Sequence, residues 1–158
     1  MKKLINPWQG AKNYNCFGCC PDNKSGLHME FYEEDNYIIS KWNPRNDFQG
    51  WINTLHGGIQ STLADEISSW VIFRKYQTGG FTSKLEIRFK KNISTTDGEI
   101  TLKANVIDKK RNMVFVNVDI FDHNNELCTQ ATVVYSIMEP QVAHDLLQFR
   151  GCLCEDEK

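Results

Sequence analysis

The chain has 158 residues, of which 41% are hydrophobic and 24% charged, which is typical of a single globular domain long enough to bury a core. Its net charge of −2 gives no reason to expect binding to nucleic acid or to a membrane surface. The N-terminus lacks the apolar core of a signal peptide, and no apolar run approaches a membrane span. We therefore expect a cytoplasmic protein whose six cysteines stay reduced.

The first segments of the chain indicate an arm followed by two strands. Residues 1–26 mix aromatic residues and cysteines with Asn, Gly and Pro, so we expect an irregular arm with at most a short helix near residues 6–13. Leu27–Glu33 and Tyr37–Trp42 are predicted to be short strands, joined by a turn at Glu34–Asn36.

After a loop over residues 43–54, the chain contains its only long segment with helical periodicity, at about residues 57–76. Apolar residues recur at a spacing of four, as at Ile59 and Leu63, and the segment is apolar on most sides. Thr78–Gly80 is a stop signal. A helix of this kind must be covered on most sides by other elements.

Four segments that alternate apolar and polar residues follow the helix, as expected of half-buried strands. A short helix is predicted after Pro140, at residues 140–149. The order of elements predicts an α+β fold, in which one long helix is wrapped by a curved antiparallel sheet of about six strands. We expect one domain over residues 27–149, followed by a loose tail at 150–158. The four strand segments lie at residues 81–90, 100–106, 114–120 and 127–138.

The chemical pattern that stands out is His56-Gly57-Gly58 at the start of the long helix. Glycines at a helix N-terminus leave backbone N–H groups unobstructed, and the helix dipole favours negative charge there. Asp65 lies further along the helix, on a stripe with the small polar residues Ser61, Thr62 and Ser69. On spacing alone, a glycine-relieved tight turn and a solvated aspartate remain an open alternative.

These residues resemble those of the hotdog-fold acyl-CoA thioesterases, in particular the branch similar to the phenylacetate-pathway (PaaI-like) thioesterases. The resemblance covers residues 27–138, and its most specific part is His56-Gly57-Gly58 followed by Asp65. The loop Phe48–Trp51 and the arm segment Asn15–Cys19 also look like that branch. The resemblance implies the hotdog fold, hydrolysis of acyl-CoA without a cofactor, and a homodimer or a tetramer made of two dimers.

The resemblance also implies the catalytic roles. Gly57 would donate its backbone N–H to the thioester carbonyl oxygen as negative charge develops. Asp65 would attack the thioester or activate a water molecule, and both alternatives stay open. His56 would position the carbonyl or the loop, and Thr82 would hold the water.

One position departs from the family pattern. Many relatives have an asparagine six residues before the histidine, where this chain has Gly50, so Gln49 is the candidate for that polar role. We expect substrate contacts from Phe48, Trp51, Asn53, Gly58 and Ser69.

The same fold also hosts hydratases and non-catalytic modules that bind acyl-CoA or fatty-acyl groups, so the fold alone does not decide the function. The carboxylate of Asp65 favours an enzyme, because a binding module has no need of it. Glu66 points about 100° away from Asp65 on the helix, so only one of them can face a shared site. We expect Glu66 to make a structural hydrogen bond or to be exposed.

The cysteines suggest a metal site only weakly. Cys16 and Cys19, with Cys20 nearby, could combine with Cys152 and Cys154 to supply four thiolates to zinc. The second pair has a single spacer residue and lies in a charged tail, so we expect free thiols and no metal.

Helix geometry predicts that the active site is shared between two chains. Gly57 and Asp65 are eight residues apart, which is about 12 Å along a straight helix. A reacting carbonyl must lie about 3 Å from both groups. We therefore expect a homodimer in which His56 and Gly57 of one subunit face Asp65 and Thr82 of the other.

Overall fold

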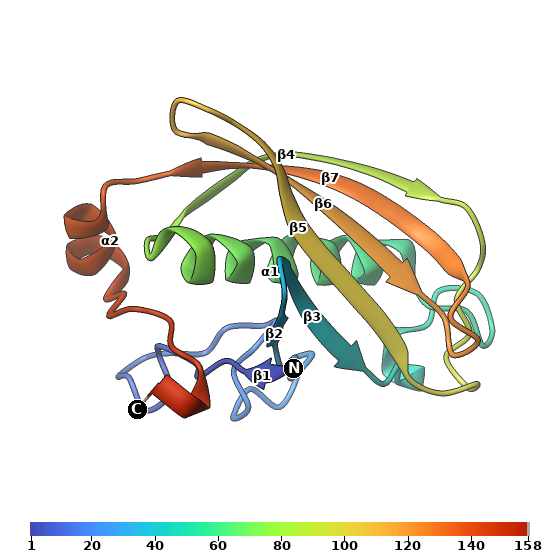
Figure 1. The fold of residues 1–158 in the computed structure, drawn as a ribbon. Helices are drawn as coiled ribbons and strands as arrows, with labels where there is room; N and C mark the ends of the chain where they lie inside the picture. The colour runs from blue at the N-terminus through green and yellow to red at the C-terminus, as the bar shows by residue number, and fades with distance from the viewer. Residues whose placement is uncertain (158) are drawn as a thin grey trace.

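The structure is a computed structural model that describes residues 1–157, and it consists of one curved antiparallel sheet around a central helix, α1 (Gly57–Tyr76) (Figure 1). The predicted α+β architecture is confirmed, with seven strands in place of about six. A second helix, α2 (Pro140–Leu147), follows the last strand as predicted. The strands, in the spatial order β1-β2-β3-β5-β6-β7-β4, are β1 (Lys2–Lys3), β2 (Tyr32–Glu34), β3 (Tyr37–Trp42), β4 (Gly80–Phe89), β5 (Ile100–Lys110), β6 (Met113–Phe121) and β7 (Leu127–Ile137).

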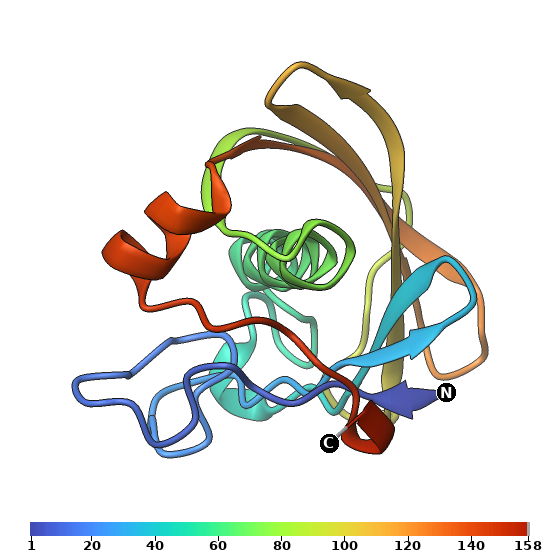
Figure 2. The ribbon, with the colours of Figure 1, turned by 60° about the vertical axis from the view of Figure 1, so that its left-hand side comes forward.

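The helix α1 has the bounds that its periodicity predicts, and it ends where Gln77 adopts a left-handed conformation. Leu63, Ile67 and Val71 are fully buried against the concave face of the sheet. Viewed nearly along the axis of α1, the sheet covers one side of the helix, and the N-terminal arm and the C-terminal segment cover another (Figure 2). The prediction that this apolar helix is covered on most sides is therefore confirmed.

The strand β4 lies at the end of the sheet and pairs only with β7 within residues 1–157. Its alternating pattern suggests apolar residues facing a core, yet Phe81 and Phe89 are 58% and 51% exposed. These side chains are exposed because β4 is an edge strand, which has a neighbouring strand on one side only. A ten-residue edge that carries exposed aromatic side chains is a surface suited to pairing with another strand.

The predicted strand Leu27–Glu33 is largely wrong, since only Tyr32–Glu34 forms β2. Upstream of β2, the backbone hydrogen-bonds to the arm instead of the sheet, with the amide of Leu27 donating to the Phe17 carbonyl at 2.7 Å. His28 has a φ of 55°, which interrupts an extended conformation. The alternating apolar residues face the core from a segment that is not part of the sheet.

The arm and the tail also differ from expectation. No helix forms within residues 6–13; this segment folds into turns, and the chain begins with β1 at the sheet edge. The tail is packed and not loose, because Cys152 and Cys154 are fully buried. Arg74 of α1 secures it through an ion pair of 2.8 Å with Glu157. No helix within residues 1–157 has the length and apolar content needed to cross a membrane.

The burial of α1 leads to a stability prediction. We expect Leu63→Ala to lower the free energy of unfolding by about 2–5 kcal/mol, because a fully buried side chain leaves a cavity between α1 and the sheet. The neighbouring change Thr62→Ala, on the more open side of the helix, should alter it by no more than about 0.5 kcal/mol. Urea denaturation of both variants measures the difference, and equal midpoints would contradict this packing.

Candidate active site

The N-terminus of α1 presents the backbone amide of Gly57 as a hydrogen-bond donor. His56 is the N-cap residue, and its Nδ1 accepts a hydrogen bond of 2.8 Å from the amide of Gly58. Within residues 1–157, the amide of Gly57 has no hydrogen-bond partner. A Cβ atom at Gly57 would lie 3.3 Å from the ring of Phe89, so glycine keeps the space beside this amide open. A free N–H at a helix N-terminus is suited to stabilise an oxyanion.

The loop before α1 surrounds this amide. Gln49 uses its side-chain oxygen to accept from the Asn53 amide at 3.1 Å, so the oxygen stabilises the loop in this chain. Gly50 lies against the His56 ring, where an added Cβ would be 3.3 Å from the ring. Trp51, at the loop tip, is 85% exposed. A cavity of about 360 Å³ is lined by Gly50, Trp51, Thr54, Leu55, His56 and Gly57, and one of about 320 Å³ by Asp47, Phe48, Gln49, His56, Gly58 and Ile59.

Asp65, which lies further along α1, forms a second group with Thr82. Thr82 is on β4, and its hydroxyl donates to Oδ1 of Asp65 at 2.5 Å. The pairing of β4 with β7 shifts register between Thr82 and Lys84. The carboxylate is half-buried, and no hydrogen bond to its Oδ2 is found within residues 1–157. The structure thus brings Asp65 and Thr82 together, as the resemblance implies.

One chain does not bring all the predicted catalytic residues to one point. His56, Gly57 and Gln49 gather at the N-terminus of α1, while Asp65 and Thr82 lie about two turns further on. The helix is continuous from Gly57 to Tyr76, so this separation is a property of the fold.

The sequence profile of the family described as "Thioesterase superfamily" matches residues 52–129, which include His56, Gly57, Asp65 and Thr82 but not Gln49. A protein of Saccharolobus solfataricus named "Putative esterase SSO1253" is 30% identical over 110 residues, covering 69% of this chain and 71% of that protein. This chain belongs to the thioesterase superfamily. As a member of that superfamily, it is a hydrolase of thioester bonds.

Solved structures confirm the predicted hotdog fold. A thioesterase from Haemophilus influenzae superposes with a TM-score of 0.65 at 20% identity, covering 72% of this chain and 80% of that one. A hypothetical thioesterase from Streptococcus pneumoniae, solved with coenzyme A, gives a TM-score of 0.64 at 22% identity, covering 70% and 88%. At these identities the likeness shows the fold, and the PaaI-like branch stays a prediction.

This thioesterase-superfamily protein has an open pocket of about 460 Å³ between the arm, α1 and β7, and neither Asp65 nor Thr82 lines it. Its wall includes Ser69 of α1, which is 7% exposed, and Tyr135 of β7. Burial raises the pKa of the Tyr135 hydroxyl, while hydrogen bonding to Thr82 and Ser69 opposes this shift. Sequence reasoning missed Tyr135, because a tyrosine in an alternating strand is indistinguishable from an ordinary core residue.

Glu66 turns away from Asp65, as predicted, and makes a structural hydrogen bond. Its Oε1 accepts from Nε1 of Trp70 at 3.2 Å. Burial and the neighbouring Cys16 raise the pKa of the Glu66 carboxyl to about 7. Hydrogen bonds from Cys19 and from backbone amides hold the pKa of the Cys16 thiol at about 6.

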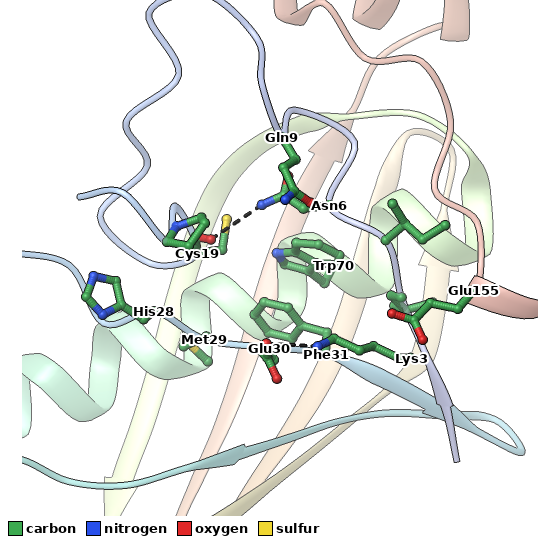
Figure 3. A pocket seen from close by; sticks show the side chains of 13 residues that line it. Lys3, Asn6, Gln9, Cys19, His28, Met29, Glu30, Phe31, Trp70 and Glu155 are labelled. Atoms are coloured by element: carbon green, nitrogen blue, oxygen red, sulfur yellow. Dashed lines mark hydrogen bonds and ion pairs between the residues drawn. The ribbon is translucent and has the colours of Figure 1, made fainter. Parts of the chain in front are cut away.

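The cysteines do not form the four-thiolate site considered from the sequence. Cys154 lies near Glu33, with its Sγ at 3.6 Å from Oε2, whereas Cys16 and Cys19 gather at Glu66. All six cysteines are free. Cys19 also borders a cavity of about 430 Å³ beneath the arm, where Figure 3 shows it close to Trp70.

The N-cap geometry gives a testable prediction. We expect His56→Ala to lower the free energy of unfolding by about 0.5–2 kcal/mol, because the Gly58 amide loses its acceptor. His56→Asn supplies a side-chain oxygen at the same position and should recover most of that loss. Urea denaturation measures both variants. An alanine variant as stable as the wild type would show that His56 does not cap the helix.

Proposed function

We propose that this protein hydrolyses acyl-CoA thioesters to the free acid and CoA. The observation that carries this proposal is the free amide of Gly57 at the N-terminus of α1, in a fold that also holds Asp65 by the hydroxyl of Thr82. The coenzyme A in the Streptococcus pneumoniae relative supports CoA as the carrier.

The Gly57 amide would act on the developing negative charge. Attack on a thioester carbonyl places negative charge on its oxygen, and an N–H that is already oriented stabilises that charge without reorganisation. Gly57 supplies such a donor at the positive end of a 20-residue helix. His56 supports it indirectly, because its bond to the Gly58 amide holds the first turn in place.

Asp65 would supply the nucleophile or the general base. Thr82 engages Oδ1, which leaves Oδ2 available to attack the carbonyl carbon or to accept a proton from water. If Asp65 acts as a general base, Thr82 also lies where it can orient the attacking water. A module that only binds acyl-CoA requires neither the carboxylate nor its hydroxyl partner, so this pair favours the enzyme.

The substrate would enter near the loop that precedes α1. Trp51 shares a pocket with Gly57, and Phe48 shares a neighbouring pocket with Gly58. Asn53, from the same loop, remains a predicted contact. Ser69 lies in the wall of the open pocket of about 460 Å³, where an acyl group could be accommodated. Cytoplasmic location remains a prediction.

A homodimer would complete the site. The free edge of β4 carries exposed Phe81 and Phe89, and it lies beside the face of α1 that holds Asp65. Ser61 adds little bulk to that face, because its short side chain lies against the helix, where its hydroxyl donates a hydrogen bond of 2.9 Å to the Gly57 carbonyl. Two copies related by a two-fold axis would place Asp65 of one opposite Gly57 of the other. Assembly of two dimers into a tetramer remains a further prediction.

The first functional test replaces the carboxylate. Asp65→Asn should lower kcat by about 10²-fold or more, because the amide can neither attack nor accept a proton as a carboxylate does. Release of free thiol from a panel of acyl-CoA substrates measures turnover, and Asp35→Asn, in the exposed turn between β2 and β3, serves as the control. Wild-type turnover by Asp65→Asn would refute the assignment. Binding of acyl-CoA without thiol release by the wild type would favour a binding module.

The second functional test mixes subunits to locate the site between chains. Asp65→Asn removes the carboxylate, and Gly57→Pro removes the amide at a first-turn position that tolerates proline. Each variant alone should be nearly inactive. In a mixed dimer with a shared site, both defects fall in one site and the other stays intact. Random exchange makes half of the dimers mixed, so activity should recover to about a quarter of the wild-type value.

A site built within one chain gives a different result. Every site in the mixed dimer would then carry one of the two defects, and activity would not recover. The control is subunit exchange measured independently, for example by mass spectrometry of subunits labelled with heavy isotopes. Confirmed exchange without recovery would exclude a site shared between chains.

A further inference from the structure

A second cluster of reactive side chains lies where the arm crosses α1. The Sγ of Cys16 is 3.7 Å from both carboxylate oxygens of Glu66. One ligand atom each from Cys16, Cys19 and Glu66 lie within 4.8 Å of one another. Ligands of a single tetrahedral zinc ion, with Zn–S of about 2.3 Å and Zn–O of about 2.1 Å, are separated by about 3.5–3.8 Å. The three side chains need only small movements to reach that spacing.

The local backbone holds the two thiols in place. Cys16 and Cys19 sit in a turn closed by the amide of Cys20, which donates to the Cys16 carbonyl at 3.1 Å. At Gly18, an added Cβ would lie only 2.4 Å from the carboxyl carbon of Glu66, so glycine permits the close approach of turn and carboxylate.

The charge at this cluster lacks a protein counterion among residues 1–157. Trp70 donates a hydrogen bond to the Glu66 carboxylate, and the Cys16 thiol lies within hydrogen-bond reach of both of its oxygens. Within residues 1–157, no lysine, arginine or histidine forms an ion pair with Glu66. A partly buried carboxylate among thiols is unfavourable unless a cation or a proton compensates it.

The cluster opens on one side to the open pocket of about 460 Å³, whose wall contains all three side chains. Ser69 and Tyr135 form another part of that wall. Three protein ligands and an open side leave room for a fourth ligand, such as water. Cys20 is not part of the cluster, because its Sγ faces the Tyr14 carbonyl at 3.7 Å.

We propose that Cys16, Cys19 and Glu66 bind one divalent cation of the zinc class, with a fourth coordination position facing the open pocket. Two sulfur ligands select zinc over magnesium or calcium, which prefer oxygen ligands. The bound ion joins the arm to α1 next to the helix face that carries Asp65. This site differs from the four-thiolate site considered from the sequence, because it uses a carboxylate in place of the cysteines in the tail. It does not depend on the proposed acyl-CoA specificity.

The test uses the full chain, reduced with a phosphine and stripped of metal with a chelator, and then titrated with Co²⁺ as a spectroscopic substitute for Zn²⁺. We expect saturation at about one ion per chain, with sulfur-to-cobalt charge-transfer absorption and the intense visible bands of a tetrahedral site. Zn²⁺ should displace Co²⁺ and raise the Tm.

Variants decide which residues bind the ion. Cys16→Ser and Glu66→Gln should each weaken Co²⁺ binding by more than about 100-fold, since even partners that only orient a ligand contribute 10–100-fold. Glu66→Gln keeps the shape of the side chain, so it remains informative if Cys16→Ser fails to fold. Cys20→Ser is the matched control in the same loop, and Cys128→Ser is the control on β7. Both controls should retain the absorption bands.

Two results would overturn the proposal. One is reduced wild-type protein that gives no thiolate-to-cobalt absorption. The other is Co²⁺ binding of unchanged affinity in both Cys16→Ser and Glu66→Gln.

Discussion

The structure depends on one constraint, which is the burial of a 20-residue helix that is apolar on most of its surface. A single sheet can cover such a helix only by curving around it, and the sheet does so from β3 to β4. The side that the sheet leaves open is closed by the arm and the tail, where Trp8 packs edge-on against Phe73 at 4.9 Å between ring centroids. The segments that are irregular in secondary structure are therefore part of the core.

The same helix also organises the chemistry. Its N-terminus offers the Gly57 amide, its middle carries Asp65 towards β4, and the next residue, Glu66, points towards the arm. Adjacent residues on a helix diverge by about 100°, so one helix serves two environments without conflict. A rigid element that is packed on most sides is suited to holding such groups, because its side chains have little freedom to move.

The free edge of β4 links the fold to the proposed assembly. A sheet that curves around one helix without closing into a barrel must end in edge strands. Here one such edge lies beside Thr82 and Asp65, with Phe81 exposed next to them. The separated catalytic groups of one chain and the edge strand β4 thus occur at the same place.

Prediction from sequence succeeded where structure follows local periodicity. The bounds of α1 and β3 match the pattern of their apolar residues, because a helix and a strand repeat their side-chain directions at fixed intervals. The prediction failed at Leu27–Phe31, where apolar and polar residues alternate as in a strand but the backbone hydrogen-bonds to the arm. Periodicity shows which side chains face a core, and it does not reveal which backbone supplies the hydrogen bonds.

In the candidate site, too, local relations could be predicted from the sequence, whereas contacts between distant segments could not. The pattern His56-Gly57-Gly58 and the spacing to Asp65 determined by themselves that an open helix N-terminus and a carboxylate lie on one helix, because that relation is local. Only the tertiary structure decided that Cys16 and Cys19 meet Glu66, while Cys152 and Cys154 pack elsewhere. Such contacts join residues far apart in the chain, and they are set by how the arm and the tail fill the space that the sheet leaves uncovered.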